Sequence, residues 1–354
     1  MKKNIITGGA GFIGSNLTKY LISHLKESVC VIDKLTYAGH IENLEGVLNN
    51  PLFSFKEVDV LETTRLLQIF KKYKPEVIYH LAAESHVDKS IDSPSDFITT
   101  NVVGTQSVLH ASLLYWQELE ERFRDKFRLI LVSTDEVYGS IASPKLFSEE
   151  SKLSPSSPYS ASKASADLIA QSYHHTYNLP VIITNCSNNY GSNQTPEKFI
   201  PLCIFKAINN ESIPIYGDGQ QIRDWIHVND HNRALVQISQ AGNIGEVYCI
   251  GAANEQSNLS IANKICSILD TISNKNKYDS YEKYIVHVPD RPGHDARYAV
   301  DATKTMSLGW QPEISFDEGL QQTVLWYLSN KTWLNAILMK NKDILSRQGK
   351  LRKL

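Results

Sequence analysis

A glycine-rich turn near the N-terminus restricts the fold of this chain more than any other feature. The run TGGAGFIG, residues 7–14, directly follows the apolar run Asn4–Thr7. Between a strand and a helix, such glycines permit a tight turn and bring backbone amides and the positive helix N-terminus against a pyrophosphate. Asp33 ends the second apolar run about 20 residues further on, where a carboxylate binds a ribose 2′-hydroxyl and repels a 2′-phosphate. The pattern predicts a dinucleotide site that takes NAD and not NADP.

Short apolar runs alternate with helix-length segments through the first half of the chain. The expected strands are Asn4–Thr7, Ser28–Ile32, Phe53–Val58, Val77–Leu81, Leu129–Ser133 and Val181–Asn185. Strands separated by segments such as Gly14–Leu25 and Thr64–Tyr73 predict a parallel sheet with helices on both faces. We therefore expect an α/β fold, a doubly wound Rossmann-type parallel sheet.

The character of the sequence changes after Tyr190, where prolines and turns such as Gly217-Asp218-Gly219 become frequent. We expect residues 1–190 to form the NAD-binding domain and residues 191–354 a smaller, mixed C-terminal lobe of helices and loops that binds the substrate. The run Glu246–Gly251 has the pattern of a buried strand. Residues from about 225 to 255 are therefore expected to rejoin the first sheet, which makes the lobe discontinuous.

Composition favours an enzyme with a small-molecule substrate. The chain of 354 residues is 42% apolar with a formal net charge of -2, which gives no reason to expect nucleic acid or a membrane surface as partner. Its five cysteines form no C-x-x-C pair, and His174-His175 lacks a third ligand candidate, so we expect reduced thiols and no metal. No signal peptide is evident, and no apolar run reaches the roughly 18 residues of a membrane span. We expect a cytoplasmic protein.

Reactive side chains gather after the fifth expected strand. Thr134-Asp135-Glu136 ends that strand, and Tyr159 and Lys163 lie four residues apart, on one face of an expected helix. The Lys163 ammonium can lower a phenol pKa that is normally about 10, so that Tyr159 takes a proton from an alcohol while a hydride leaves. Asp135 and Glu136 add acid/base capacity that alcohol oxidation does not need, which indicates a second reaction. The alternative for the two carboxyl groups alone is a polar strand end that faces solvent.

Longer runs carry a family resemblance over nearly the whole chain. They are Ile32–Gly39, His80–Asp88, Thr134–Gly139, Asn185–Gly191, Gln221–Trp225 and Asp290–Asp295. These runs resemble the extended short-chain dehydrogenases/reductases and, within them, the dTDP-glucose 4,6-dehydratases. The resemblance implies a reaction that converts dTDP-glucose to dTDP-4-dehydro-6-deoxy-glucose and water, a step toward rhamnose-type deoxysugars, with one tightly bound NAD recycled in each turnover.

The resemblance also implies individual roles. Tyr159, with Lys163, would take the O4 proton as the C4 hydride passes to NAD⁺, and Thr134 would hydrogen-bond the sugar near O4. Glu136 would remove the C5 proton while Asp135 protonates the departing C6 hydroxyl, before the hydride returns to C6. Adjacent carboxyl groups in a shielded site tend to have separated pKa values, which suits this division.

Two sets of binding residues follow from position and resemblance. The cofactor set is Gly8, Gly11, Phe12, Ile13, Gly14, Asp33, Lys34, Leu35, Thr36, Asp59, Val60, Leu81, Ala82, Ala83, Ser85, Thr100, Tyr159, Lys163 and Asn189. The substrate set is Ser85, His86, Thr134, Asn188, Lys198, Phe199, Pro214, Ile215, Tyr216, Arg223, Asn258, Asp290, Arg291, Pro292, Gly293 and His294. The arginines suit a diphosphate because the planar guanidinium makes two charge-assisted bonds.

Several alternatives stay open. A UDP-glucose 4,6-dehydratase fits the same motif, because Ser192–Thr195 stands where proline commonly follows Tyr190-Gly191 in the family, beside the nucleotide. A nucleotide-sugar 4-epimerase shares the glycine turn and the Tyr/Lys pair but needs no carboxyl pair. A silent NAD-binding sensor is the non-enzyme alternative, since a fold alone does not give function. The family also implies a homodimer through a helical bundle that includes Asn101–Trp116, and the basic tail from Lys340 is expected to be a frayed terminus.

Overall fold

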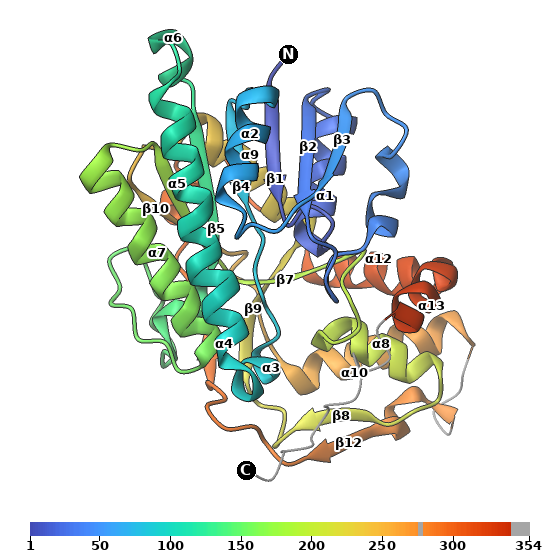
Figure 1. The fold of residues 1–354 in the computed structure, drawn as a ribbon. Helices are drawn as coiled ribbons and strands as arrows, with labels where there is room; N and C mark the ends of the chain where they lie inside the picture. The colour runs from blue at the N-terminus through green and yellow to red at the C-terminus, as the bar shows by residue number, and fades with distance from the viewer. Residues whose placement is uncertain (275–278, 341–354) are drawn as a thin grey trace.

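A seven-stranded parallel sheet forms the larger part of the molecule (Figure 1). The structure is a computed structural model that describes residues 1–274 and 279–340, so nearly all of the basic tail lies outside the described residues. The sheet order is β10-β6-β5-β4-β1-β2-β3, and its direction of winding reverses between β1 and β4. Its strands are β1 Lys3–Thr7, β2 Ser28–Asp33, β3 Phe53–Glu57, β4 Val77–His80, β5 Arg128–Thr134, β6 Val181–Cys186 and β10 Val247–Ile250. The order confirms the expected doubly wound Rossmann-type fold.

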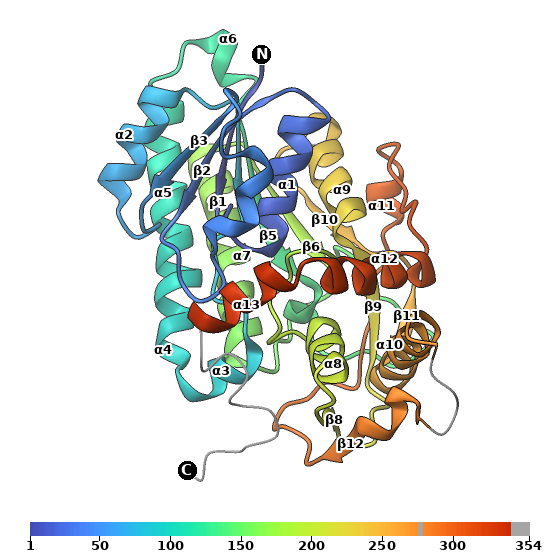
Figure 2. The same ribbon diagram turned by 90° about the vertical axis from the view of Figure 1, so that its right-hand side faces the viewer.

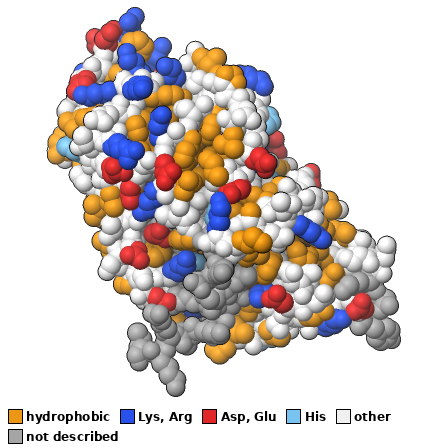
Figure 3. Space-filling view, turned by 45° about the vertical axis from the view of Figure 1, so that its right-hand side comes forward, with side chains coloured by type: hydrophobic (Ala, Val, Ile, Leu, Met, Phe, Trp, Pro, Cys, Tyr) orange, Lys and Arg blue, Asp and Glu red, His pale blue; other side chains and the backbone are white. Residues whose placement is uncertain are grey.

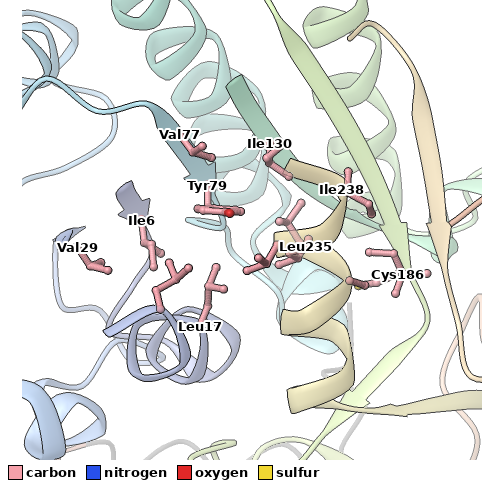
Figure 4. Close-up of a cluster of buried hydrophobic side chains, with 14 of the residues drawn as sticks. Ile6, Leu17, Val29, Val77, Tyr79, Ile130, Cys186, Leu235 and Ile238 are labelled. Carbon is pink, nitrogen blue, oxygen red and sulfur yellow. The ribbon is translucent and has the colours of Figure 1, made fainter. Parts of the chain in front are cut away.

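Helices cover both faces of this sheet. On one face α1 (Phe12–Ser23) and α9 (Val228–Ala241) contribute Leu17 and Leu235 to a buried cluster with Ile6 (Figure 4). On the other face lie α2 (Thr63–Tyr73), α5 (Gly104–Gln117) and α7 (Pro158–Tyr177), which share a cluster with Ile5. Successive side chains of a strand point to opposite faces, so neighbouring isoleucines of β1 serve two different cores.

The smaller part contains strands as well as helices. β9 (Ile222–His227) pairs with β7 (Asn188–Tyr190), β11 (Glu255–Ser257) and β13 (Arg297–Tyr298), while β8 (Ile213–Tyr216) pairs with β12 (Ile285–Val288). These strands correct the expectation of helices and loops alone. They span only two to six residues, and proline or charged residues interrupt them, so their apolar pattern is too short to stand out in the sequence.

Four helices enclose the core of the smaller part. They are α8 Phe199–Ile208, α10 Asn258–Ile272, α12 Phe316–Ser329 and α13 Lys331–Lys340. Figure 2 shows α12 and α13 running between the large sheet and the rest of this part. Residues 228–250 belong to the larger part. Helix α9 covers the large sheet, and β10 pairs with β6 as the outer strand of that sheet.

Short helical segments complete the described chain. They are η1 Ile41–Val47, α3 Val87–Asp92, α4 Pro94–Phe97, η2 Ile98–Val103, α6 Glu121–Arg124, η3 Asp135–Tyr138, η5 Tyr281–Tyr284 and α11 Thr303–Met306. Over residues 1–274 and 279–340, the structure contains no helix with the length and apolar character that a membrane span requires. On the face drawn in Figure 3, basic and acidic side chains are interspersed.

Candidate active site

A cavity of about 430 Å³ opens at the carboxyl ends of the strands of the large sheet. Its wall includes Gly8 after β1, Asp33 at the end of β2, Thr134 at the end of β5 and Cys186 at the end of β6, and residues of the smaller part close it. Ligands of open α/β sheets bind at this edge, beside the point where the winding direction reverses. The volume is in the range of small-molecule sites.

Most residues singled out from the sequence lie together in the wall of this cavity. They are Gly8, Gly11, Phe12, Ile13, Gly14, Asp33, Lys34, Thr36, Val60, Leu81, Ala82, Ala83, Ser85, His86, Thr100, Thr134, Glu136, Tyr159, Lys163, Asn188, Asn189, Lys198, Phe199, Pro214, Tyr216, Arg223, Asn258, Arg291 and His294. The structure places outside the wall Leu35, Asp59, Asp135, Ile215, Asp290, Pro292 and Gly293.

The glycine-rich turn requires glycine at two positions. Gly8 has a φ of +70°, and a Cβ there would lie 2.6 Å from the backbone nitrogen of Ala82. A Cβ on Gly14 would lie 2.4 Å from the Gly8 carbonyl oxygen. At the N-cap of α1, Gly11 offers no side chain to the first amides of the helix, which leaves them for a ligand.

Asp33 is fixed by the backbone around it. Its carboxylate accepts hydrogen bonds from the amides of Ala10 at 3.0 Å and Leu35 at 2.9 Å. Burial raises the pKa of Asp33, and these two hydrogen bonds oppose that rise. The neighbouring Lys34 ammonium lies 3.1 Å from the Asp59 carboxylate. Asp59 itself lies outside the cavity wall, which Lys34 and Val60 line.

The two carboxyl groups after β5 differ in their surroundings. Asp135 is 1% exposed, and burial, Glu136 and Asp224 raise its pKa well above the usual range. Burial also raises the pKa of Glu136, but the charges of Arg291, Arg223 and Lys198 oppose that rise. Asp135 therefore keeps its proton more firmly than Glu136 does.

Thr134 connects Asp135 to the cavity. Its hydroxyl donates to Asp135 Oδ1 at 3.3 Å and accepts from the Glu136 amide at 3.3 Å. The same hydroxyl is a hydrogen-bond partner of Tyr159. Asp135 is absent from the wall, so the Thr134 hydroxyl is its connection to the cavity.

The cap of α7 fixes the positions of Tyr159 and Lys163. Ser157 and Ser160 form a reciprocal capping box at 3.1 and 2.9 Å, and Pro158 occupies the first turn. Tyr159 and Lys163, one turn apart on this helix, both reach the cavity.

The expected lowering of the Tyr159 pKa is wrong for the protein alone. Burial and the charges of Glu136, Cys186 and Asp135 raise this pKa well above the value of free tyrosine. The Lys163 ammonium donates instead to the Val132 carbonyl at 2.8 Å. The sequence argument counted one charge, whereas the fold places two acidic groups beside the phenol and removes water from it.

Three cations line the cavity near Glu136. The Arg223 guanidinium lies 4.2 Å from the centre of the Tyr298 ring and donates to the Asp295 carbonyl at 2.9 Å. Arg291 pairs with Asp88 at 2.8 Å. With Lys198, these groups form a site for an anion, and a diphosphate suits two guanidinium forks.

Some buried polar atoms of the wall are placed to bind a polar ligand. Among the residues that the structure describes, Asn188 Oδ1, Asn189 Oδ1 and Trp225 Nε1 have no hydrogen-bond partner. Buried polar groups are rarely left unpaired, so a polar molecule fits here. The glycine turn and Asp33 fit a dinucleotide at the other end of the same cavity. In residues 1–274 and 279–340, no group of three His, Cys, Asp or Glu side chains is placed to hold a metal ion.

Sequence reasoning gave no role to several wall residues, among them Asp88, Trp225 and Tyr298. Asp88 and Trp225 ended runs that carried the resemblance, so their positions were a signal. No sequence signal pointed to Tyr298, because its position depends on the pairing of β13 with β9.

Comparison with known proteins gives consistent matches. The family model described as GDP-mannose 4,6 dehydratase matches residues 5–323. The dTDP-glucose 4,6-dehydratase of Neisseria meningitidis is 48% identical over 342 residues, which are 96% of each chain. That of Escherichia coli is 46% identical over 95% of this chain and 96% of its own.

Solved structures show the same relationship. DesIV, a dTDP-glucose 4,6-dehydratase from Streptomyces venezuelae crystallised with NAD, superposes with a TM-score of 0.86 at 39% identity, covering 95% of this chain and 99% of its own. The UDP-glucose 4-epimerase of Thermotoga maritima superposes with a TM-score of 0.82 at 28% identity, covering 93% and 99%. Dehydratases and epimerases thus share the fold.

Proposed function

Because the chain belongs to the family of dTDP-glucose 4,6-dehydratases, we propose that it converts dTDP-glucose to dTDP-4-dehydro-6-deoxy-glucose and water with NAD as a recycled cofactor. The observation that carries this proposal is the pair of a buried Asp135 and a half-buried Glu136 in the cavity wall, with unequal surroundings, beside Tyr159. A hydride transfer alone uses no such pair.

The chain's own residues account for each proton. NAD⁺, held by the glycine-rich turn and Asp33, would supply the acceptor for the C4 hydride and, once reduced, the hydride donor for C6. Tyr159 takes the O4 proton as a phenolate, a form that the positive charges of bound NAD⁺ and of Lys163 would favour against the effect of burial. Lys163 would also hold the nicotinamide ribose. The new C4 carbonyl acidifies C5–H, so Glu136 removes that proton as the C6–O bond breaks. The departing hydroxyl takes the Asp135 proton and leaves as water, and Glu136 finally returns its proton to C5.

The proton count then requires one more transfer. After a turnover Tyr159 has gained the O4 proton and Asp135 has lost one, so a proton must pass from Tyr159 to Asp135. The Thr134 hydroxyl is a hydrogen-bond partner of both groups. It therefore serves as the route that restores the starting state, in addition to binding the sugar near O4.

The rest of the wall suits the ends of the two ligands. The glycine turn, Asp33 and Val60 would hold NAD, while Arg223, Arg291 and the other substrate residues would hold the diphosphonucleoside. A UDP-glucose 4,6-dehydratase is the second candidate, since Gln194 and Thr195 of the unusual 192–195 loop line the cavity.

One assay separates these candidates. The purified protein is incubated in turn with dTDP-, UDP-, GDP- and CDP-glucose, and the mass of each product is measured by mass spectrometry. We expect loss of one water with dTDP-glucose. Loss only with UDP-glucose would favour the second candidate, an isomer of unchanged mass would indicate an epimerase, and no change with any hexose would favour a sensor.

We further propose a cytoplasmic homodimer. The five free cysteines are buried and suit a reducing compartment. Exposed apolar side chains on η2 and α7, Ile98, Val103 and Leu168, are 47%, 49% and 55% exposed, along helices that lie side by side in Figure 1. Leu168→Glu should convert the dimer to a monomer in sedimentation velocity, whereas a monomeric wild type would contradict this assembly.

A further inference from the structure

Asn43, on η1, joins three segments that lie far apart in the sequence. Its Nδ2 donates to the Ala10 carbonyl at 2.8 Å, and its Oδ1 accepts from Trp333 Nε1 at 2.8 Å and from Asn193 Nδ2 at 3.4 Å. Asn43 is 0% exposed, so water does not replace a bond that is lost. We call Asn43, Ala10, Trp333 and Asn193 the Asn43 junction. It ties helix α13 to the glycine-rich turn.

Ala10 is held at both of its backbone polar groups. Its N–H donates to Asp33 Oδ2 at 3.0 Å, and its carbonyl accepts from the His40 amide at 3.0 Å as well as from Asn43. The next residue, Gly11, lines the cavity, whereas Ala10, Asn43 and Trp333 do not. The turn is thus held from inside the cavity by Asp33 and from outside it by His40 and Asn43, while its following residues line the cavity.

Helix α13 is itself held by aromatic contacts. Trp333 packs edge-on against Trp326, with ring centres 4.8 Å apart, and lies 6.1 Å from Tyr327. The Tyr327 hydroxyl donates to the carbonyl of Gln194, which lines the cavity. The same aromatic group therefore reaches both the cofactor turn and the 192–195 loop, and Figure 2 shows α12 and α13 in this intermediate position.

We propose that Asn43 and Trp333 are positioning residues for the dinucleotide, because the Asn43 junction holds the glycine-rich turn in the shape that binds a pyrophosphate. This inference rests on the proposed use of NAD. A turn that is ordered before binding loses little conformational entropy when the ligand arrives. Loosening the junction should therefore speed the release of NAD although no residue in contact with it has changed.

Two variants and a matched control test the inference. Trp333→Phe removes the indole donor to Asn43 and keeps an aromatic ring, and Asn43→Asp keeps the acceptor for Trp333 but removes the donor to Ala10. Trp310→Phe is the control, because Trp310 is also buried and its Nε1 donates to the Asp230 carbonyl at 3.0 Å. The rate of NAD release from the purified holoprotein and the free energy of unfolding in urea are measured for all of them.

We expect Trp333→Phe and Asn43→Asp to release NAD between about twofold and tenfold faster, the effect of one buried hydrogen bond. The control should lose comparable stability and keep the wild-type release rate. Unchanged release in Trp333→Phe, or equally fast release in the control, would overturn the inference. If Asn43→Asp does not fold, Trp333→Phe decides alone. A wild-type protein that binds no NAD would instead contradict the proposed function.

Discussion

The Arg291 guanidinium lies 2.8 Å from the Asp88 carboxylate, although the two residues are 203 positions apart. Burial opposes ionisation of Asp88, but Arg291, His86 and Tyr216 together lower its pKa. The pair therefore stays ionised throughout the neutral range. It holds the Nη1 nitrogen of the guanidinium, and under the proposed function the remaining N–H groups would bind the diphosphate.

Asp88→Asn should weaken substrate binding. Without its ionic partner Arg291 must be ordered by the substrate, which costs about 1 kcal/mol or roughly a fivefold rise in KM, while kcat changes little. Steady-state kinetics measure both constants. Glu62→Gln breaks the exposed pair with Arg65 and should change neither. A fall in kcat at constant KM would contradict this role of Asp88.

Gly8→Ala should destabilise the protein. The positive φ and the approach of the Ala82 backbone make the added methyl group cost about 2 kcal/mol or more. Gly46→Ala is the matched control, because its Cβ meets nothing within 4 Å. Urea unfolding should separate the two variants. Equal stabilities would show that the turn can relax around a side chain.

The sequence predicts the larger part of the fold better than the smaller. Apart from the edge strand β3, the strands of the large sheet are mostly buried and form nearly continuous apolar runs. Each expected strand is confirmed to within two residues. β8 and β12 are short strands; β8 alternates buried and half-buried residues, and β12 has no fully buried residue. Their pairing depends on contacts between distant segments, which no local pattern records.

The candidate site was predictable where a motif carries it. Gly8, Asp33 and Tyr159 stand at strand ends or on one helix face, so their meeting follows from the fold. The pKa of Tyr159 was not predictable, because it depends on the burial and on the charges that the folded chain brings together. For the same reason the sequence did not indicate the Asn43 junction.

The buried Asp135 should make stability depend on pH. The pKa of Asp135 in the folded protein is raised above the unfolded value of about 3.9. The stability that the protonated carboxyl group contributes is therefore fully present below the unfolded pKa and is lost as the pH rises toward the folded pKa. Each unit of difference corresponds to about 1.4 kcal/mol. Asp135→Asn cannot ionise and should gain stability over the wild type between pH 5 and pH 8, as measured by urea unfolding. If the difference in free energy of unfolding between the variant and the wild type does not change from pH 5 to pH 8, Asp135 is ionised in the folded protein and the account is contradicted.

The same variant should lose activity. An amide has no acidic proton for the departing hydroxyl, and a general acid contributes about 100-fold or more. Turnover of dTDP-glucose should fall by that factor, while reduction of bound NAD⁺ by the substrate continues. Equal loss of both steps would indicate a structural defect.

Glu136→Gln tests the central claim most directly, because it removes the base for C5 and leaves Tyr159 and Lys163 intact. Rapid mixing with dTDP-glucose is followed by nicotinamide absorbance and by mass spectrometry of the sugar. We predict that bound NAD⁺ is reduced and stays reduced, with no loss of water, and that Tyr159→Phe shows no reduction at all. Water loss at the wild-type rate in Glu136→Gln would contradict the assignment of oxidation to Tyr159 and elimination to the carboxyl pair.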